Sequence, residues 1–131
     1  MERVVRCRTI NASGKSKAEI AFEERGGRIV VTRWTAEEAR NFRVRISKYL
    51  SDCGASADLA ELQRKRSGNA NPSSFDDRIL ITEESAEYLR IRSAGTLVAI
   101  GLKGDGVKEY LFTIEREDAF LLADDLKSLG F

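Results

Sequence analysis

The chain has 131 residues, of which 42% are hydrophobic and 33% are charged, and its formal net charge is +1. This size and composition predict a single globular domain over residues 1–131 that folds without disulfides or metal. The chain contains no histidine, which excludes Ser–His and Cys–His catalysis, and its two cysteines are too few to favour a zinc site.

The N-terminal residues and the cysteines indicate a cytoplasmic protein. No apolar run approaches the roughly 20 residues of a membrane helix, and three arginines among the first eight residues oppose a signal peptide. Cys7 and Cys53 lie far apart in the sequence and are expected to be reduced thiols. The strand period places Cys7 opposite its arginine neighbours, so we expect it to be an inert buried thiol.

The first half of the chain predicts a hairpin followed by a helix. Residues 17–24 alternate between polar and apolar, Gly26-Gly27 favours a tight turn, and residues 28–34 are rich in β-branched side chains. Thr35 is expected to cap a helix that runs to about Leu50, with Glu38 completing a capping box. The apolar stripe of this helix contains Ala39, Phe42, Ile46 and Tyr49 or Leu50.

The second half of the chain repeats this plan. Residues 96–102 and 107–114 are strand-like around a turn at 103–106, and a helix is expected from about Arg116, with a stripe of Ala119, Leu122, Leu126 and Leu129. A shift of 80 residues superimposes the apolar positions of the two segments, which predicts an internal repeat. The matched positions are Val30 with Tyr110, Thr32 with Phe112, Trp34 with Ile114, Ala39 with Ala119, Phe42 with Leu122, and Ile46 with Leu126.

Further strands are expected before each hairpin, at residues 4–10, 78–82 and 87–92. Residues 56–66 can form a short helix, and residues 67–74 form a loop. The predicted fold is therefore α+β: a curved antiparallel sheet of about six to seven strands with two main helices on one side. Unit 1 spans about 1–50, a connector spans 51–75, and unit 2 spans about 76–131.

No motif indicates an enzyme or a cofactor. Gly14-Lys15-Ser16 resembles the end of a phosphate-binding loop, but position 9 is Thr9 and a strand follows instead of a helix. The glycine cluster at 101–106 joins two strands, as a hairpin turn does. Adjacent acidic pairs such as Asp76-Asp77 point to opposite faces of a strand. We therefore expect a non-enzyme without metal or cofactor.

Basic and aromatic residues alternate on several predicted strands. If the faces of those strands coincide, guanidinium groups lie beside a ring, as single-stranded nucleic acid requires. The alternative is an ordinary solvated sheet face. The candidate nucleic-acid or partner contacts are Arg6, Arg8, Lys17, Tyr88, Arg90 and Arg92.

Charge is distributed unevenly along the chain. Residues 1–50 contain 12 Lys and Arg against 6 Asp and Glu, whereas residues 51–131 contain 10 against 15. The first main helix presents a candidate basic face of Arg40, Arg43, Arg45 and Lys48, and the second presents Glu117, Asp118, Asp124 and Asp125. These faces predict helices that meet, within one chain or across a dimer. Arg64-Lys65-Arg66 with the first helix could alternatively bind phosphate or an acidic partner.

Two functions fit these features. The first is a protein-interaction module of the adaptor, inhibitor or antagonist type, expected to be dimeric. The alternative is a protein that binds single-stranded DNA or RNA through the basic sheet face. The layout of strands followed by a helix, repeated twice, resembles that of the Whirly and Pur-repeat group of single-stranded nucleic-acid binders. The resemblance covers most of the chain apart from 51–75, rests on no sequence motif, and carries over no residue role.

Overall fold

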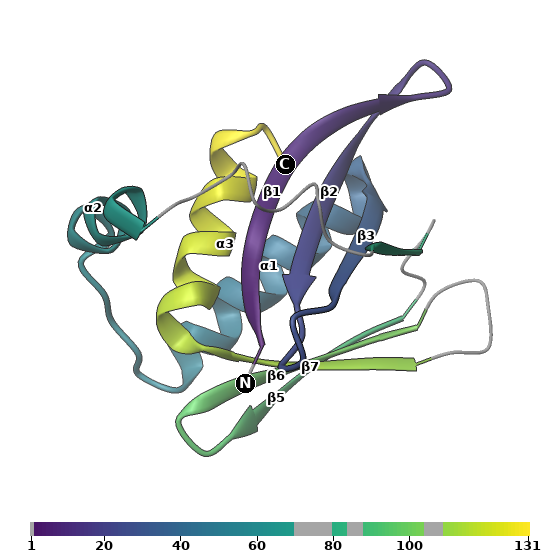
Figure 1. Cartoon of the computed structure of the whole chain (residues 1–131). Coiled ribbons are helices and arrows are strands. Elements are labelled where there is room, and N and C mark those ends of the chain that lie inside the picture. The colour runs from purple at the N-terminus through teal and green to yellow at the C-terminus, as the bar shows by residue number, and fades with distance from the viewer. Residues whose placement is uncertain (1, 70–79, 84–87, 104–108) are drawn as a thin grey trace.

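The computed structural model describes residues 2–69, 80–83, 88–103 and 109–131. Within this part of the chain, the structure is α+β, with seven strands and three helices (Figure 1). The elements, in chain order, are β1 (Arg3–Ala12), β2 (Lys15–Glu23), β3 (Ile29–Thr35), α1 (Ala36–Asp52), α2 (Leu59–Asn69), β4 (Leu80–Glu83), β5 (Tyr88–Ala94), β6 (Leu97–Lys103), β7 (Glu109–Glu115) and α3 (Arg116–Ser128).

The strands form two sheets instead of the single antiparallel sheet that the sequence predicts. One sheet has the order β1-β2-β3-β4 and the other the order β5-β6-β7. All neighbours are antiparallel except β3 and β4, which are parallel. The amide of Glu2 donates a hydrogen bond of 2.9 Å to the carbonyl oxygen of Thr113, which brings the start of the chain beside β7.

The two sheets share one core because their apolar faces point toward each other. The rings of Phe22 on β2 and Phe112 on β7 stack with centroids 4.2 Å apart. The strands of the second sheet run across those of the first, and α1 and α3 lie side by side against the first sheet (Figure 1). Two sheets arranged in this way bury their apolar faces against each other and the helices, whereas one open sheet would need the helices alone to cover it.

Each of the two main helices begins at the position that the sequence predicts, whereas α2 begins at Leu59 instead of residue 56. The hydroxyl oxygen of Thr35 accepts a hydrogen bond of 3.2 Å from the backbone amide of Glu38 and caps α1. Glu115 stands at the corresponding position of α3 without a side-chain cap. Helix α2 extends to Asn69, beyond the predicted end at residue 66, so residues 67–69 of the predicted loop are helical. Residues 70–74 of that loop and 104–106 of the predicted turn lie outside the described residues.

The predicted repeat matches the register of the strands. Ile20 pairs with Thr32 and Glu19 with Arg33 in unit 1, and the residues 80 positions later pair in the same way, Ile100 with Phe112 and Ala99 with Thr113. All twelve residues matched in the sequence are buried. Because paired positions agree as well as apolar ones, the two units share the same hairpin geometry.

One buried polar contact breaks the symmetry of the core. The indole Nε1 of Trp34 donates to the hydroxyl of Thr32 at 2.8 Å, and that hydroxyl donates to the carbonyl oxygen of Ile20 at 2.8 Å. Thr32 thus satisfies the indole N–H, which would otherwise be buried without a partner. The corresponding position in unit 2 is Phe112, which needs no such bond.

Candidate functional site

Strand β1 carries basic residues on the side that faces away from the core. Arg6 pairs with Ala21 and Arg8 with Glu19, whereas Cys7 between them pairs with the buried Ile20. Lys17 lies two residues before Glu19 on β2 and therefore on the same outer side. The structure thus places Arg6, Arg8 and Lys17 on one face of the first sheet, with a β-bulge at residue 5 preceding Arg6.

Three arginines of this face converge on one buried carboxylate, Glu19. The distances to its carboxylate oxygens are 3.0 Å from Nη2 of Arg6, 2.9 Å from Nε of Arg8 and 3.7 Å from Nε of Arg33. The side chain of Glu19 is only 2% exposed. A buried carboxylate requires charged partners, and Glu19 obtains them from both neighbouring strands.

This arginine cluster, consisting of Arg6, Arg8 and Arg33 around Glu19, reaches the surface. The side chains of Arg8 and Arg33 are 51% and 41% exposed, and that of Arg6 is 23% exposed. Because Glu19 fixes the arginines and lies below them, the cluster presents ordered cationic donors to solvent.

Arg33 was missed as a site residue in the sequence, although a signal for it was present. In the observed register Glu24 and Arg28 flank a connection over 25–27, and Arg33 stands opposite Glu19. An arginine directly across from a glutamate on an outer face is a favourable cross-strand pair. The signal is incomplete, because a two-residue turn at Gly26-Gly27 would place Trp34 opposite Glu19 instead.

The other candidate contacts lie in the second sheet. Arg90 pairs with Gly101 and Arg92 with Ala99, so the register gives both positions the outer side of β5. Arg92 is exposed, whereas the side chains of Tyr88 and Arg90 lie outside the described part of the chain. The six candidates therefore do not share one sheet face. The sequence could not reveal this separation because it does not specify how the two sheets are joined.

The two arginine pairs nevertheless occupy equivalent positions. Arg8 stands opposite Glu19 and Arg92 opposite Ala99, and positions 19 and 99 are related by the repeat. Arg6 and Arg90 stand opposite Ala21 and Gly101, which are related in the same way. In each unit, the strand directly before the shared hairpin, β1 or β5, thus has arginines at two equivalent register positions.

The charged faces of the two main helices are only partly as predicted. Helices α1 and α3 do meet, and their apolar stripes belong to one core cluster, except that the predicted stripe residue Leu129 is exposed at the end of α3. Arg40, Arg45 and Lys48 are exposed on α1, whereas Arg43 is half-buried and donates a hydrogen bond of 2.7 Å to the carbonyl oxygen of Phe131.

Two of the four acidic residues of α3 bind α2. Gln63 donates to Asp124 at 2.5 Å, and Arg66 donates to both carboxylate oxygens of Asp125 at 2.6 and 3.1 Å. Of the four acidic residues on this face, Glu117 is exposed and Asp118 is half-buried. Burial raises the pKa of Asp118, and a hydrogen bond from the Val4 amide opposes that shift. Complementary charges thus connect α3 with α2, whereas the prediction paired the acidic face of α3 with the basic face of α1.

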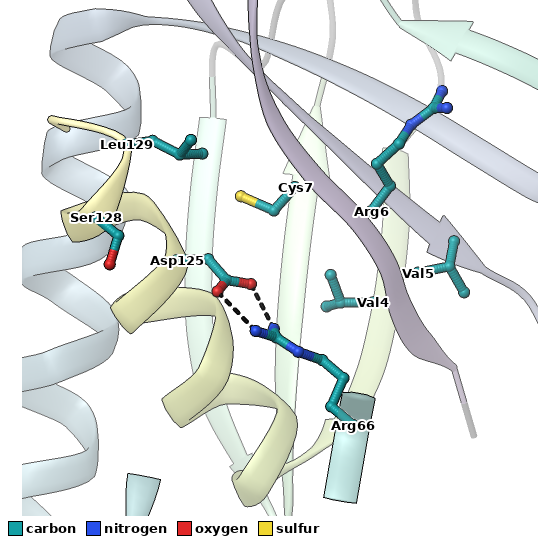
Figure 2. Close-up of a pocket in the computed structure, with 8 residues that line it drawn as sticks. All are labelled: Val4, Val5, Arg6, Cys7, Arg66, Asp125, Ser128 and Leu129. Carbon is teal, nitrogen blue, oxygen red and sulfur yellow. Dashed lines mark hydrogen bonds and ion pairs between the residues drawn. The ribbon is translucent and has the colours of Figure 1, made fainter. Parts of the chain in front are cut away.

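A pocket of about 370 Å³ lies between β1 and α3. Cys7 points toward α3 within it, while the side chains of Arg6 and Val5 project to the other side of β1 (Figure 2). Burial, with a smaller contribution from the charge of Asp125, raises the pKa of Cys7 to about 12. A thiol with this pKa is protonated at neutral pH, which agrees with the predicted inert Cys7, whereas Cys53 is exposed.

Neither a protein-family model nor a curated protein sequence matches the chain. Among the described residues, no group of His, Cys, Asp and Glu side chains could hold a metal ion. No helix in the same part of the chain is long and apolar enough to cross a membrane.

Proposed function

We propose that this protein is a non-enzymatic nucleic-acid-binding protein whose two arginine pairs, Arg6/Arg8 and Arg90/Arg92, contact phosphate groups. The observation that carries the proposal is the equivalence of the pairs. Both stand at equivalent register positions, on β1 and on β5, each of which is the strand directly before the hairpin shared by the two units. Guanidinium groups suit this role because they donate two parallel hydrogen bonds to a phosphate and stay charged at all physiological pH values.

The arginine cluster of unit 1 favours contact with the sugar-phosphate backbone. Glu19 holds Arg6, Arg8 and Arg33 in place, so little side-chain entropy is lost when a phosphate binds them. The described residues on the outer side of the first sheet include no aromatic ring that could stack on a base. We therefore expect binding that depends strongly on salt and weakly on sequence.

Unit 2 offers a second phosphate contact of the same kind, in which the residue paired with the arginine is uncharged. Ala99 occupies the position of Glu19, so no carboxylate stands opposite Arg92. In this proposal, a nucleic-acid strand that is long enough to reach both units binds more tightly than a short oligonucleotide. The second contact becomes intramolecular once the first has formed.

The test is a fluorescence-anisotropy titration of labelled single-stranded DNA and RNA at low and moderate salt. Arg8→Gln and Arg92→Gln are each expected to weaken binding about threefold to tenfold and to lower the slope of log K against log salt by about one. Arg25→Gln is the matched control because it removes one exposed charge from the turn between β2 and β3. Its effect is expected to be smaller than twofold, on the order of a long-range screened interaction.

The absence of binding at about 50 mM salt, where phosphate contacts are strong, would overturn the proposal. Equal losses for all three variants would also contradict it, because they would indicate a general charge effect instead of two defined contacts. Circular dichroism of each variant checks that the substitution leaves the fold intact.

The second candidate function is a protein-interaction module that pairs with another copy of itself. Leu111 favours it, because this side chain is 65% exposed on the outer side of β7, opposite Gly101. A second copy could cover Leu111 and extend the sheet at the edge strand β5. Light scattering tests this candidate: a dimer that becomes a monomer in Leu111→Ser supports it, and a monomeric native protein contradicts it.

A further inference from the structure

The C-terminal part of α2 is a third basic region that neither arginine pair includes. Arg64, Lys65 and Arg66 are consecutive and exposed. Lys65 pairs with Glu61 at 3.5 Å within the same helix, whereas Arg66 reaches out of the helix to Asp125 on α3. The Arg66–Asp125 contact is bidentate, with both terminal nitrogens of the guanidinium donating to the carboxylate.

Helix α2 is attached to α3 mainly through polar contacts. Over residues 59–66, for which side chains are described, no side chain is fully buried, and Leu59 and Leu62 are half-buried. Gln63 and Arg66 bind the neighbouring carboxylates of Asp124 and Asp125. A helix that is held in this way can change partners at little cost, because exposed ion pairs are weak.

The location of Arg66 connects it with the arginine cluster. Arg66 and Arg6 both line the pocket at the edge of β1, one from α2 and the other from the strand (Figure 2). The hydrogen bond that Arg66 donates to Asp125 raises the pKa of the Arg66 guanidinium. Arg6 projects to one side of the edge strand β1 and Arg66 lies on the α3 side, so a nucleic-acid strand that crosses β1 toward α3 would pass from Arg6 to Arg66.

We propose that the basic end of α2, Arg64-Lys65-Arg66, is a second phosphate-binding element, and that the carboxylate of Asp125 occupies it in the absence of nucleic acid. This inference rests on the proposed nucleic-acid binding and adds an internal competitor to it. A carboxylate and a phosphate both accept two parallel hydrogen bonds from a guanidinium, so a phosphate can replace Asp125 on Arg66 without a change in the geometry of the donor. Binding of nucleic acid and the Arg66–Asp125 contact then oppose each other reciprocally.

The experiment is a double-mutant cycle in which the affinity for a labelled single-stranded oligonucleotide is measured by anisotropy. Asp125→Asn frees Arg66 and is expected to tighten binding about threefold. Arg66→Gln removes the phosphate contact and is expected to weaken binding about threefold and to lower the salt slope by about one. In the Arg66→Gln background, Asp125→Asn is expected to change affinity by less than twofold, because the residue it would free is gone.

Glu117→Gln is the matched control for the loss of one negative charge on α3. Glu117 is exposed near the start of the helix, far along it from Asp125, so its removal is expected to change affinity by less than twofold. A thermal unfolding curve for each variant identifies any substitution that lowers the folded fraction. If Asp125→Asn does unfold the protein, Asp125→Glu keeps the charge, moves the carboxylate, and is expected to leave affinity between the native and the freed value.

The inference is overturned if Asp125→Asn and Glu117→Gln tighten binding equally, or if Asp125→Asn has the same effect with and without Arg66. Either result with intact binding by the native protein leaves the proposed function standing. The loss of all binding in the native protein rejects the proposed function and this inference together. A non-additive cycle with a lower salt slope in Arg66→Gln supports both.

Discussion

The two strand–strand–helix units agree on their inner side and differ on their outer side. Phe22 and Leu102, and likewise Ile20 and Ile100, take the same places in the common core. The outer positions follow no such rule. Glu19 and Arg33 of unit 1 correspond to Ala99 and Thr113 of unit 2. The helices show the same contrast, because Arg45 on α1 corresponds to Asp125 on α3.

The difference shows which positions the fold constrains and which are available for function. An inner side chain must fit the volume between two sheets and two helices, so both units keep apolar residues there. On the outer side, Ala21, Ile29 and Val31 form a small second buried cluster, whereas arginines such as Arg8 are partly exposed, so a change of charge at those exposed positions affects packing less. The arginine pairs are the exception, because both units have kept them at outer positions.

The largest effect is expected where the units agree most closely. Phe42→Ala and Leu122→Ala empty equivalent places in the shared core, where both side chains are fully buried. We expect losses of about 3–5 kcal/mol and 2–5 kcal/mol in the free energy of unfolding, which includes the cost of the cavities. Urea denaturation measures both values. A loss below about 1 kcal/mol for either variant would contradict the shared core.

A smaller loss is expected where the two cores differ. Thr32→Val keeps the shape of the side chain but removes the hydroxyl that joins Trp34 to the carbonyl of Ile20. The unpaired indole N–H and carbonyl should lower the free energy of unfolding by about 1–3 kcal/mol. Thr32→Ser is the control, since it keeps the hydroxyl and loses only a methyl group. If Thr32→Val is as stable as the native protein, the buried hydrogen bonds contribute nothing.

Much of this comparison could be predicted from local sequence patterns. The alternation in 17–24, the Gly26-Gly27 turn and the cap at Thr35 each depend on neighbouring residues, and the structure has β2, β3 and α1 at these places. The shift of 80 residues predicted which side chains would be buried in both units. Local periodicity suffices here because a half-buried strand or helix carries its own orientation in its pattern.

The rest depends on contacts between distant segments, for which one sequence contains no direct signal. The pattern of a strand does not say which sheet it joins, so a single sheet was predicted and Arg6 was grouped with Arg90. The attachment of α2 was missed for the same reason, because Arg66 and Asp125 are 59 residues apart. Basic residues near acidic ones are common in a sequence, and only the fold determines which of them form ion pairs.

The pH dependence of stability should distinguish the strands that precede the hairpins, β1 and β5. Cys7 takes the place of Ile91, which cannot ionise, and its folded pKa of about 12 lies above the ordinary thiol value of 9.0. The unfolded thiol therefore ionises first, and the Cys7 contribution to stability is complete below pH 9 and decreases as the pH rises toward about 12. We expect a decrease of up to about 1 kcal/mol per pH unit in this range.

Urea denaturation of the native protein and Cys7→Ala across this alkaline range measures that contribution. The variant also unfolds at lower urea because it loses packing, so the comparison uses the change with pH and not the absolute stability. The native protein should lose stability more steeply than the variant. Parallel curves would mean that the Cys7 thiol ionises equally easily in the folded and unfolded chain.

The smallest expected effect is on the affinity for single-stranded DNA. It distinguishes the arrangement of the arginines from the total charge of the protein. Glu19→Gln raises the net charge by one but removes the carboxylate that fixes Arg6 and Arg8. Glu24→Gln raises the net charge equally and removes the ion pair with Arg28 in the turn between β2 and β3.

If total charge decides the affinity for single-stranded DNA, both variants bind slightly more tightly. We expect Glu19→Gln alone to bind about threefold more weakly, because mobile arginines lose entropy when they bind phosphate. Anisotropy titrations at one salt concentration, corrected for the folded fraction, decide between these outcomes, and tighter binding by Glu19→Gln would exclude a positioning role for Glu19.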